Sequence, residues 1–542
     1  VCTSKLGGVS IRTRGEPRES PGGRVLHVYP PNYDGKREQP AFSRLLEAYQ
    51  GAFVGDWSTL AERKVRPGDV ILVHAGLYQA NPLSYVDPMG VPFDGTYVLT
   101  AKGTADQPIV IKAAGDGEVI FDGGGLTHTL FNVMAADHHI FDGFTFRNVD
   151  VVFQAGLRDV LGCSGLTVRN CRFENVGMGI NTQFSGSRNF YIADNVFLGR
   201  KDRHRLRGWT AGKIVDAQGK ESWIEPKYGV NLLTSYYAVR VYGSGHVIAH
   251  NAMAYFHDGV GICTHGTPDP DPANWAVSID IYNNDIHLSA DDFIEADGGV
   301  HNIRVFRNRG VNAAHAGLSG QPIFGGPAYY YRNVLYHIQA GVPFKFYARC
   351  AGVIAYHNTA IAEMRVNDPF SNAHLRNNLF LGTDQPGRPI LSVVNSTAYS
   401  TSDFNGYRPN KKTDDNYQWA APPKGELRND ALTMAEHGSK FRNLAELAAA
   451  TGREGHGLEI DYDVFKRLDP PDLADDPLKI FHAEDLDFTL RSDGKAVDAG
   501  MPIPTINDDF QGQAPDLGAL ELGLPEPVYG PRHRKSDAAF YR

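Results

Sequence analysis

Three residues that can take part in proton transfer stand at one fixed distance from repeated asparagines. Asp258, Asp291 and His315 each lie seven residues after an asparagine in the middle of the chain. If those asparagines align on successive coils of a repeat, the three side chains form a column with about 4.8 Å between neighbours. Carboxyl groups stacked this closely repel one another, so at least one should have a raised pKa. Such a split into proton donor and proton acceptor is what general acid–base catalysis needs.

Further acids and a histidine adjoin this column. His257 and Asp292 are its direct neighbours, and the segment ADDFIEADGG (290–299) adds Glu295. Two carboxyls about 5 Å apart suit retaining glycoside hydrolysis, and a gap of roughly 6.5–9.5 Å suits inversion. Stacked acids can equally hold Ca²⁺ or form turns. The catalytic candidates are Asp258, Asp291, Asp292, Glu295, His257 and His315.

Two groups of basic residues could bind an anionic sugar chain or act on it. The segment RKDRHRLR (200–207) stands out in an acidic protein, and its Arg203 and Arg205 could pair bidentately with carboxylates or sulfates. Lys345 and Arg349 follow the column by one or two coils. In a lyase, a Lys or His removes the proton next to a carboxylate that Arg or Ca²⁺ neutralises. The competing interpretation is a solvated loop and surface ion pairs.

Aromatic side chains crowd the same region, and sugar-binding surfaces commonly present such rings as flat apolar platforms. Tyr236, Tyr237 and Trp275 are the candidates for sugar contact because they flank inserted segments. Aromatic residues at alternate positions of strands also stack inside cores, so burial is the alternative for each of them.

The elements that must position these residues repeat about every 25 residues. Each unit is a short alternating apolar run, an asparagine and a second short run rich in Val, Ile, Phe and Tyr. Alternation with period two indicates strands, and a fixed period of this length is typical of stacked coils. Asparagine tolerates the left-handed backbone of a tight bend and can stack as an amide ladder. The expected ladder residues are Asn170, Asn195, Asn251, Asn284, Asn308, Asn333, Asn358 and Asn378.

This pattern predicts an all-β protein, a right-handed parallel β-helix with a cap at each end. Helical spacing in 42–52 predicts a short helix in the N-terminal cap, and 441–452 predicts a second helix ending at Gly. Segments 199–229 and 266–275 interrupt the repeat and are expected to wall a binding site. The expected parts are an extended arm (1–23), a cap with the first coils (24–125), the main β-helix (126–410) and a C-terminal cap and tail (411–542).

Bulk properties exclude several classes. A net charge of −9 argues against a general nucleic-acid binder, and no apolar run is long enough for a membrane span. Five scattered cysteines do not form a disulfide scaffold. The first residues, VCTSKLGG, contain no charged-then-apolar leader. Either a signal peptide has been removed or the protein is cytoplasmic, and we expect the first, a secreted or periplasmic protein.

The chain resembles the right-handed parallel β-helix proteins of the pectate-lyase-like superfamily. The resemblance rests on PGDVILVHAGLY, GTADQPIVIKAAGDGEVIFDGGG, the asparagine coils and AVDAG…NDDFQGQAPDLGALE, and spans roughly 24–523. It implies a long groove on one face and an extended carbohydrate as ligand. Of the polygalacturonase-like motifs only the pair Asp291-Asp292 is present, and neither a lyase pattern nor an epimerase motif is complete. The fold alone therefore does not assign a reaction.

Three hypotheses follow for function. The acidic column favours a glycoside hydrolase that cleaves a polysaccharide with paired carboxylates on adjacent coils. The alternative is a polysaccharide lyase, or a uronate epimerase, acting on an anionic polysaccharide. The second alternative is a glycan-binding solenoid without catalysis. The hydrolase needs no cofactor and no metal, whereas Ca²⁺ remains an option at the acidic coil. A polysaccharide or oligosaccharide is the expected partner, with no nucleic acid and no membrane span.

Overall fold

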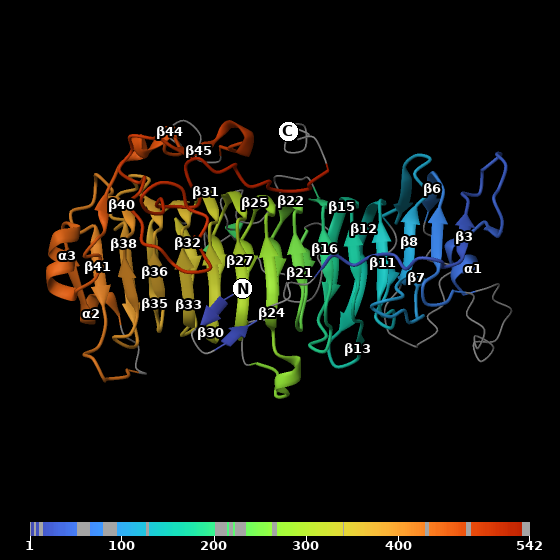
Figure 1. The fold of residues 1–542 in the computed structure, drawn as a ribbon, viewed down its shortest axis with the longest axis horizontal. Coiled ribbons are helices and arrows are strands. Elements are labelled where there is room, and N and C mark those ends of the chain that lie inside the picture. Colours follow the sequence, from blue (N-terminus) through green and yellow to red (C-terminus); the bar gives the residue numbers. More distant parts are fainter. Residues whose placement is uncertain are drawn as a thin grey trace.

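Parallel strands stack coil upon coil along one long axis, as the asparagine period predicts (Figure 1). The predicted right-handed parallel β-helix is confirmed. The computed structural model describes residues 2–4, 7–9, 15–50, 65–79, 95–125, 129–200, 214–215, 221–222, 235–262, 268–339, 341–428, 433–472 and 479–533. Among the helices of these ranges none is long and apolar enough to cross a membrane.

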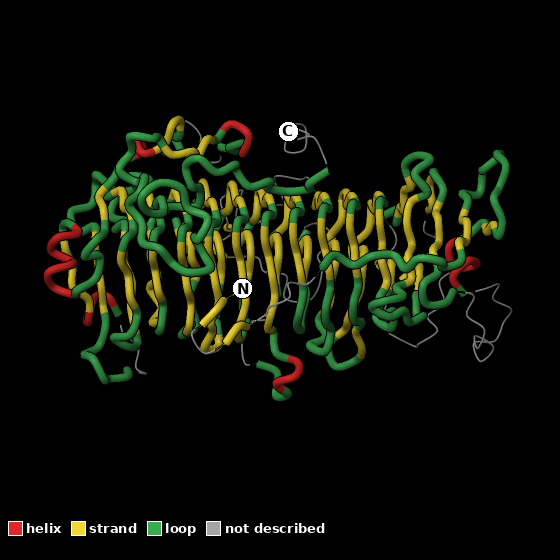
Figure 2. Tube along the Cα trace, in the orientation of Figure 1, coloured by secondary structure: helices red, strands yellow, loops and turns green. Residues whose placement is uncertain are grey.

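One wall of the solenoid is a 14-stranded sheet, whose strands precede the asparagines. Strands lie side by side along the length of the solenoid, with loops at their ends (Figure 2). All its pairings are parallel and link each coil to the next. Its members are β4 (Ala41–Phe42), β3 (Val25–Val28), β5 (Val70–Val73), β8 (Ile109–Ala113), β11 (His139–Asp142), β14 (Thr167–Arg169), β16 (Tyr191–Ala193), β21 (Val247–Ala249), β24 (Val277–Tyr282), β27 (His301–Phe306), β30 (Phe324–Tyr331), β33 (Ala351–Tyr356), β36 (His374–Arg376) and β39 (Thr401–Asp403).

The remaining walls belong to a 21-stranded sheet that bends. Many coils contribute two short strands to it, one on each side of the bend. Its members are β6 (Gly76–Gln79), β7 (Gly95–Val98), β9 (Val119–Asp122), β10 (Thr129–Asn132), β12 (Thr145–Leu157), β13 (Leu161–Gly162), β15 (Arg172–Thr182), β17 (Val196–Gly199), β20 (Tyr237–Arg240), β22 (Ala252–Phe256), β23 (Asp258–Gly261), β25 (Asp285–Ser289), β26 (Asp292–Glu295), β28 (Arg309–Ala313), β29 (Ala316–Ser319), β31 (Val334–Ile338), β32 (Val342–Lys345), β34 (Thr359–Ile361), β37 (Leu379–Leu381), β40 (Gly406–Arg408) and β43 (Leu458–Glu459).

A 4-stranded sheet continues the stack at the C-terminal end, and short elements decorate the ends and loops. The sheet consists of β35 (Met364–Phe370), β38 (Leu391–Asn395), β41 (Tyr417–Ala420) and β42 (Gly438–Phe441). Two-stranded pairs are β1 (Cys2–Ser4) with β2 (Gly7–Val9), β18 (Ile214–Val215) with β19 (Glu221–Ser222), and β44 (Phe465–Arg467) with β45 (Asp487–Leu490). The helices are α1 (Leu45–Tyr49), α2 (Met434–His437), α3 (Leu444–Thr451), η4 (Pro272–Asn274), η5 (Tyr462–Val464) and η6 (Ala483–Asp485).

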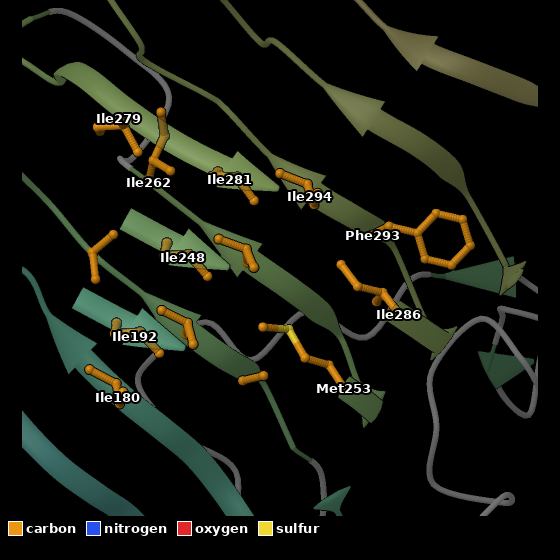
Figure 3. Packing of buried hydrophobic residues seen from close by; sticks show 14 of the residues in the cluster. Ile180, Ile192, Ile248, Met253, Ile262, Ile279, Ile281, Ile286, Phe293 and Ile294 are labelled. Carbon is orange, nitrogen blue, oxygen red and sulfur yellow. The ribbon is translucent and has the colours of Figure 1, made fainter. Parts of the chain in front are cut away.

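The interior is a stack of identical or similar apolar side chains. Ile192, Ile248 and Ile281 are register partners on three successive coils, and none of the three is exposed (Figure 3). Met253 pairs with Ile286 in the same way on the facing wall. Burying one such side chain stabilises the fold by about 1.5–3 kcal/mol. Alternation along each strand supplies this core, because every second residue points inward.

A ladder of buried asparagines locks the coils in register. The side-chain Nδ2 of Asn284 donates to Asn308 Oδ1 at 2.9 Å and to the Ile248 carbonyl at 3.0 Å. The Asn284 backbone N–H donates to the same Asn308 oxygen at 3.0 Å. This pattern repeats along the helix through Asn195, Asn251, Asn284, Asn308, Asn333, Asn358, Asn378 and Asn405.

Two details of the predicted ladder are wrong. Asn170 is exposed and donates to Asp142, whereas the ladder position belongs to Cys171, whose N–H donates to Asn195 Oδ1 at 3.0 Å. The left-handed bend also lies one residue before each ladder asparagine, because the ladder side chain must point inward to reach its neighbours. The residues with positive φ at these bends are Asn170, Asp194, His250, Asn283, Arg307, Arg332, His357, Asn377 and Phe404.

Both ends of the stack are covered. The short helix predicted at the N-terminal end is α1, which buries Leu45, Ala48 and Tyr49, while Phe42 lies in β4. At the other end α3 stops at Gly452, whose φ of +67° is left-handed as expected for such a cap. Residues 479–533 then fold back along the solenoid (Figure 1), where Arg532 pairs with Asp194 at 2.6 Å.

A buried carboxylate closes the C-terminal end of the asparagine ladder. Glu454 is only 2% exposed, and its Oε1 accepts hydrogen bonds from Ser402, from Asn405 Nδ2 and from the Tyr407 hydroxyl. Burial raises the pKa of Glu454 to about 7, although these donors lower it.

This raised pKa predicts a pH-dependent stability. Because the folded pKa lies above the value of 4.5 for an unperturbed Glu, wild-type stability should fall by up to about 3 kcal/mol as pH rises from 4.5 through 7. Glu454→Gln should flatten this part of the profile in denaturant unfolding measured across pH. The exposed Glu426→Gln serves as control, and an unchanged slope in Glu454→Gln would contradict the prediction.

Candidate active site

The candidate acids converge at the bend between the two rows of the 21-stranded sheet. Asp258 opens β23 directly after the bend at His257, and Asp292 opens β26 after Ala290 and Asp291. Positions at such a bend point away from the apolar interior, so polar side chains from neighbouring coils can gather there.

The predicted column is shifted by one residue. Val260 pairs with Ile294, so Asp258 aligns with Asp292 rather than with Asp291. Asp291 instead aligns with His257 of the preceding coil, and the Asp291 N–H donates to the His257 carbonyl at 2.8 Å. The reason is local: the bend before β26 is one residue longer than the bend before β23.

The predicted stacking of Asp291 and His315 is confirmed. Both coils have the same bend length, since Asp292 pairs with Ala316. His315 Nδ1 lies 2.7 Å from Asp291 Oδ1. On the neighbouring coil His257 Nδ1 lies 2.7 Å from Asp258 Oδ2, so each histidine fixes the orientation of one carboxylate.

Four carboxylates form one tight cluster. Asp258, Asp291, Asp292 and Glu295 each offer an oxygen within 4.8 Å of the others. Asp258 and Asp292 are buried, whereas Asp291 is 24% exposed and leaves the cluster open to solvent on that side. We call these four residues the acidic cluster.

Lys345 is the positive charge inside the acidic cluster. Its Nζ lies 2.6 Å from Asp292 and 3.4 Å from Asp291, and its side chain is 6% exposed. Register pairs Lys345 with Ser319 and Ser319 with Glu295, so the lysine comes from two coils beyond β26. The sequence groups Lys345 with substrate-binding residues, with a surface ion pair to the acidic coil as the alternative; the pairing is confirmed, but the side chain is buried.

The pKa values of the cluster residues are shifted in different directions. Burial alone would raise the pKa of Asp291, but the His315 hydrogen bond and the Lys345 charge hold it far below its usual range. Burial and the neighbouring Asp291 charge raise the pKa of Asp292. Burial also raises the pKa of Glu295, and Asp258 adds to this. Burial lowers the pKa of Lys345, but the surrounding carboxylates outweigh it and keep the ammonium protonated.

The donor set fits a hard cation such as Ca²⁺. Asp292 is fully buried, yet neither of its oxygens takes a regular hydrogen bond from the described part of the chain. Its partners are the charges of Lys345 and, at 3.9 Å, of His315. Gathered carboxylate oxygens are the ligands Ca²⁺ prefers, and four carboxylates around one lysine leave an excess of negative charge whose burial costs several kcal/mol. Asp258, Asp291, Asp292 and Glu295 are the residues that would hold it.

The predicted tyrosine platform is only partly available. Tyr237 is buried, and its hydroxyl donates to Glu295 at 2.6 Å, so it positions an acid instead of presenting a face to sugar. Tyr236 is part exposed, with its ring 4.3 Å from Tyr237 and 5.4 Å from His257.

The other predicted binding residues lie apart from the cluster or outside the description. Trp275 donates to the Asp269 carbonyl within its own loop. Arg349 is exposed in the turn after β32 and forms no ion pair with the described residues. Arg203 and Arg205, with most of 199–229, lie outside the described residues.

The sequence indicates Asp297 as an acid alternating with Glu295 or as a turn former, not as a catalytic candidate, and Arg240 was missed. Asp297 is buried, accepts hydrogen bonds from Ser319 and the Gln321 N–H, and has its pKa raised by burial to about 6. Arg240 ends β20 beside Tyr236 and Tyr237. A signal was present in the sequence, since Arg240 closes the strand that begins at Tyr237.

No family model matches the sequence, and no curated protein matches it. Among solved structures the chain is similar to pectate lyase Pel9A, with 16% identity, 92% of this chain and 96% of that chain covered, and a TM-score of 0.42. It is also similar to a mannuronic acid specific family 6 polysaccharide lyase from human gut microbiota, with 12% identity, 64% of this chain and 76% of that chain covered, and a TM-score of 0.40. A rhamnogalacturonan lyase gives 14% identity, coverage of 87% and 97%, and a TM-score of 0.36.

Proposed function

We propose that this protein is a calcium-dependent polysaccharide lyase that cleaves a uronate-containing polymer by β-elimination. The observation that carries the proposal is the position of Lys345, a buried ammonium 2.6 Å from Asp292 within the acidic cluster. A proton-accepting amine beside a cation site is the combination that elimination next to a carboxylate needs.

Each residue of the site has a separate role in the proposed reaction. With a cation held by the acidic cluster, the carboxylates would no longer keep Lys345 protonated, and its deprotonated amine takes the proton from C5 of the uronate, next to its carboxylate. The electron pair of that C–H bond forms the C4=C5 double bond, the glycosidic C4–O bond breaks, and the leaving oxygen takes a proton from solvent. His257 and His315 hold Asp258 and Asp291 in place for cation binding. When bound, Ca²⁺ supplies the positive charge that neutralises the uronate carboxylate as C5 loses its proton.

Hydrolysis, the first expectation from the sequence, has weaker support from this geometry. A hydrolase needs one carboxylic acid that can give up a proton and one carboxylate facing the sugar. Here four carboxylates crowd within 4.8 Å, and their nearest partners are a lysine, two histidines and the Tyr237 hydroxyl. Repulsion between the crowded carboxylates destabilises the folded protein unless a cation is bound among them. Hydrolysis does not require four carboxylates, so it does not explain this arrangement.

A polymeric substrate also supports a location outside the cytoplasm. A uronate polymer would meet the enzyme where the polymer is deposited, which agrees with the expected secreted or periplasmic site. The location is part of the proposal and rests on the substrate class.

Calcium should stabilise the folded protein through the acidic cluster. With Ca²⁺ at about 100 times its Kd, unfolding should cost about 3 kcal/mol more than after treatment with a chelator. Asp292→Asn should remove this gain, because it deletes the buried charge at the centre of the cluster. Calorimetric melting with and without Ca²⁺ measures it. Asp414→Asn, at an exposed acid, should keep the gain, and an equal gain in Asp292→Asn would exclude this site.

Activity should depend on Lys345. Lys345→Ala should lower kcat on the order of 10³-fold, because the general base is lost. The assay is a panel of uronate polymers read for ultraviolet absorbance of unsaturated uronates and for reducing ends on the same sample. The exposed Lys440→Ala is the matched control. Reducing ends without absorbance would establish hydrolysis, and altered sugar configuration without cleavage would establish epimerisation; either result overturns the lyase proposal.

A further inference from the structure

Among the residues described, Arg240 lacks the ion pair with the preceding coil that several arginines of the sheets form. Arg147, Arg169, Arg304 and Arg309 each form an ion pair with an aspartate one coil earlier. At the corresponding place beside Arg240 stands Asn181, which is neutral. Within the described residues Arg240 forms no ion pair with an acid. An arginine is therefore kept on the coil next to the acidic cluster without neutralisation from the previous coil.

The guanidinium of Arg240 is nevertheless held in place. Its Nε donates to Asn181 Oδ1 at 2.9 Å, and its central carbon lies 5.2 Å from the Tyr237 ring centre and 5.7 Å from that of Tyr236. An Nε hydrogen bond and two rings fix the plane of the group. In the part of the chain that the structure describes, Arg240 makes its contacts through Nε and the guanidinium face, which leaves the paired Nη donors for a planar anion.

The position along the helix places Arg240 at the N-terminal border of the site. In register, Gln154, Asn181, Arg240, Gly261, Glu295, Ser319 and Lys345 form one column across the coils. Gln154 and Asn181 are each 6% exposed and bond to one another, so the column is closed on that side. Arg240 is the first part-exposed member.

Gly261 makes room between Arg240 and the acidic cluster. It lacks a side chain, and a Cβ there would lie 2.7 Å from the Tyr237 ring. The Tyr237 side chain therefore crosses the coil of Gly261 and reaches Glu295 with its hydroxyl. Arg240 and Glu295 are two strand spacings apart, about 10 Å along the axis, with Lys345 an equal distance beyond.

We propose that Arg240 binds the carboxylate of a second uronate of the same polymer, which lies farther toward the N-terminal end of the solenoid than the sugar being cleaved. The inference rests on the proposed lyase function and specifies its substrate. A chain engaged at Lys345 and at Arg240 presents two uronate carboxylates that are more than one sugar apart, because two or more strand spacings separate these residues along the axis. The preferred substrate is therefore a polymer with closely spaced uronates, and polymers in which uronates are isolated among neutral sugars bind less well.

The test compares homopolymeric uronans with their partially carboxyl-reduced forms, in which isolated uronates are flanked by neutral sugars. Polygalacturonate, polymannuronate and polyguluronate are used separately as probes. Arg240→Gln should raise KM for the homopolymer about 10- to 100-fold with little change in kcat, and KM for the reduced form should stay nearly constant. Arg240→Lys should recover only part of the loss, because an ammonium lacks the planar fork.

Binding without turnover gives an independent measure. In a Lys345→Ala background, isothermal titration with the homopolymer should show the same loss of affinity for Arg240→Gln and a weaker dependence on salt. Arg304→Gln, on the outer wall and paired with Asp280, is the matched control and should change neither value. Melting temperatures establish that each variant is folded.

The outcomes separate the two proposals. If Arg240→Gln lowers kcat equally on homopolymer and reduced polymer, the residue only supports Tyr237 and Glu295, and the subsite is refuted. Unchanged KM and affinity refute it as well, while the lyase function stands. If the wild type neither binds nor cleaves any of the three uronans, the proposed function fails and this inference fails with it.

Discussion

The asparagine ladder is the interaction on which the rest of this structure depends. Each buried amide bonds to the asparagine of the next coil and to a backbone carbonyl of the coil before, so a slip of one residue would leave several buried polar groups without partners. Each such group costs about 1–3 kcal/mol. Register is therefore fixed at one corner of every coil. Bends and loops differ in length from coil to coil, and their lengths decide where the residues after each ladder asparagine lie relative to the neighbouring coils.

The acidic cluster is a consequence of one such variation. Because the bend before β26 has one residue more than the bend before β23, Asp291 and Asp292 both turn toward Asp258. With bends of equal length, Asp258 and Asp291 would align in a simple column. The extra residue instead converts a row of separated charges into a compact group that encloses Lys345.

Charge compensation distinguishes the site from the rest of the surface. On the outer walls, arginines and aspartates alternate between coils and neutralise one another, as Arg304 and Asp280 do. At the site the negative charges are segregated into the acidic cluster, and Arg240 is separated from them by the bare coil of Gly261. Segregated charge of both signs costs stability, and under the proposed function it gives an anionic polymer and a cation distinct places to bind.

The sequence by itself determined the solenoid and most of the ladder, because a 25-residue period and strand alternation are local patterns that no globular arrangement would preserve. It also identified the coils that carry the acids and the pairing of Asp291 with His315. It misplaced Asn170, since a one-residue shift between bend and ladder leaves the local pattern unchanged. Only the tertiary structure decided that Asp258 faces Asp292, that Lys345 reaches back across two coils, and that Tyr237 turns inward to Glu295. These contacts join residues whose separation along the chain depends on loop lengths, so spacing in the sequence carries no direct record of them.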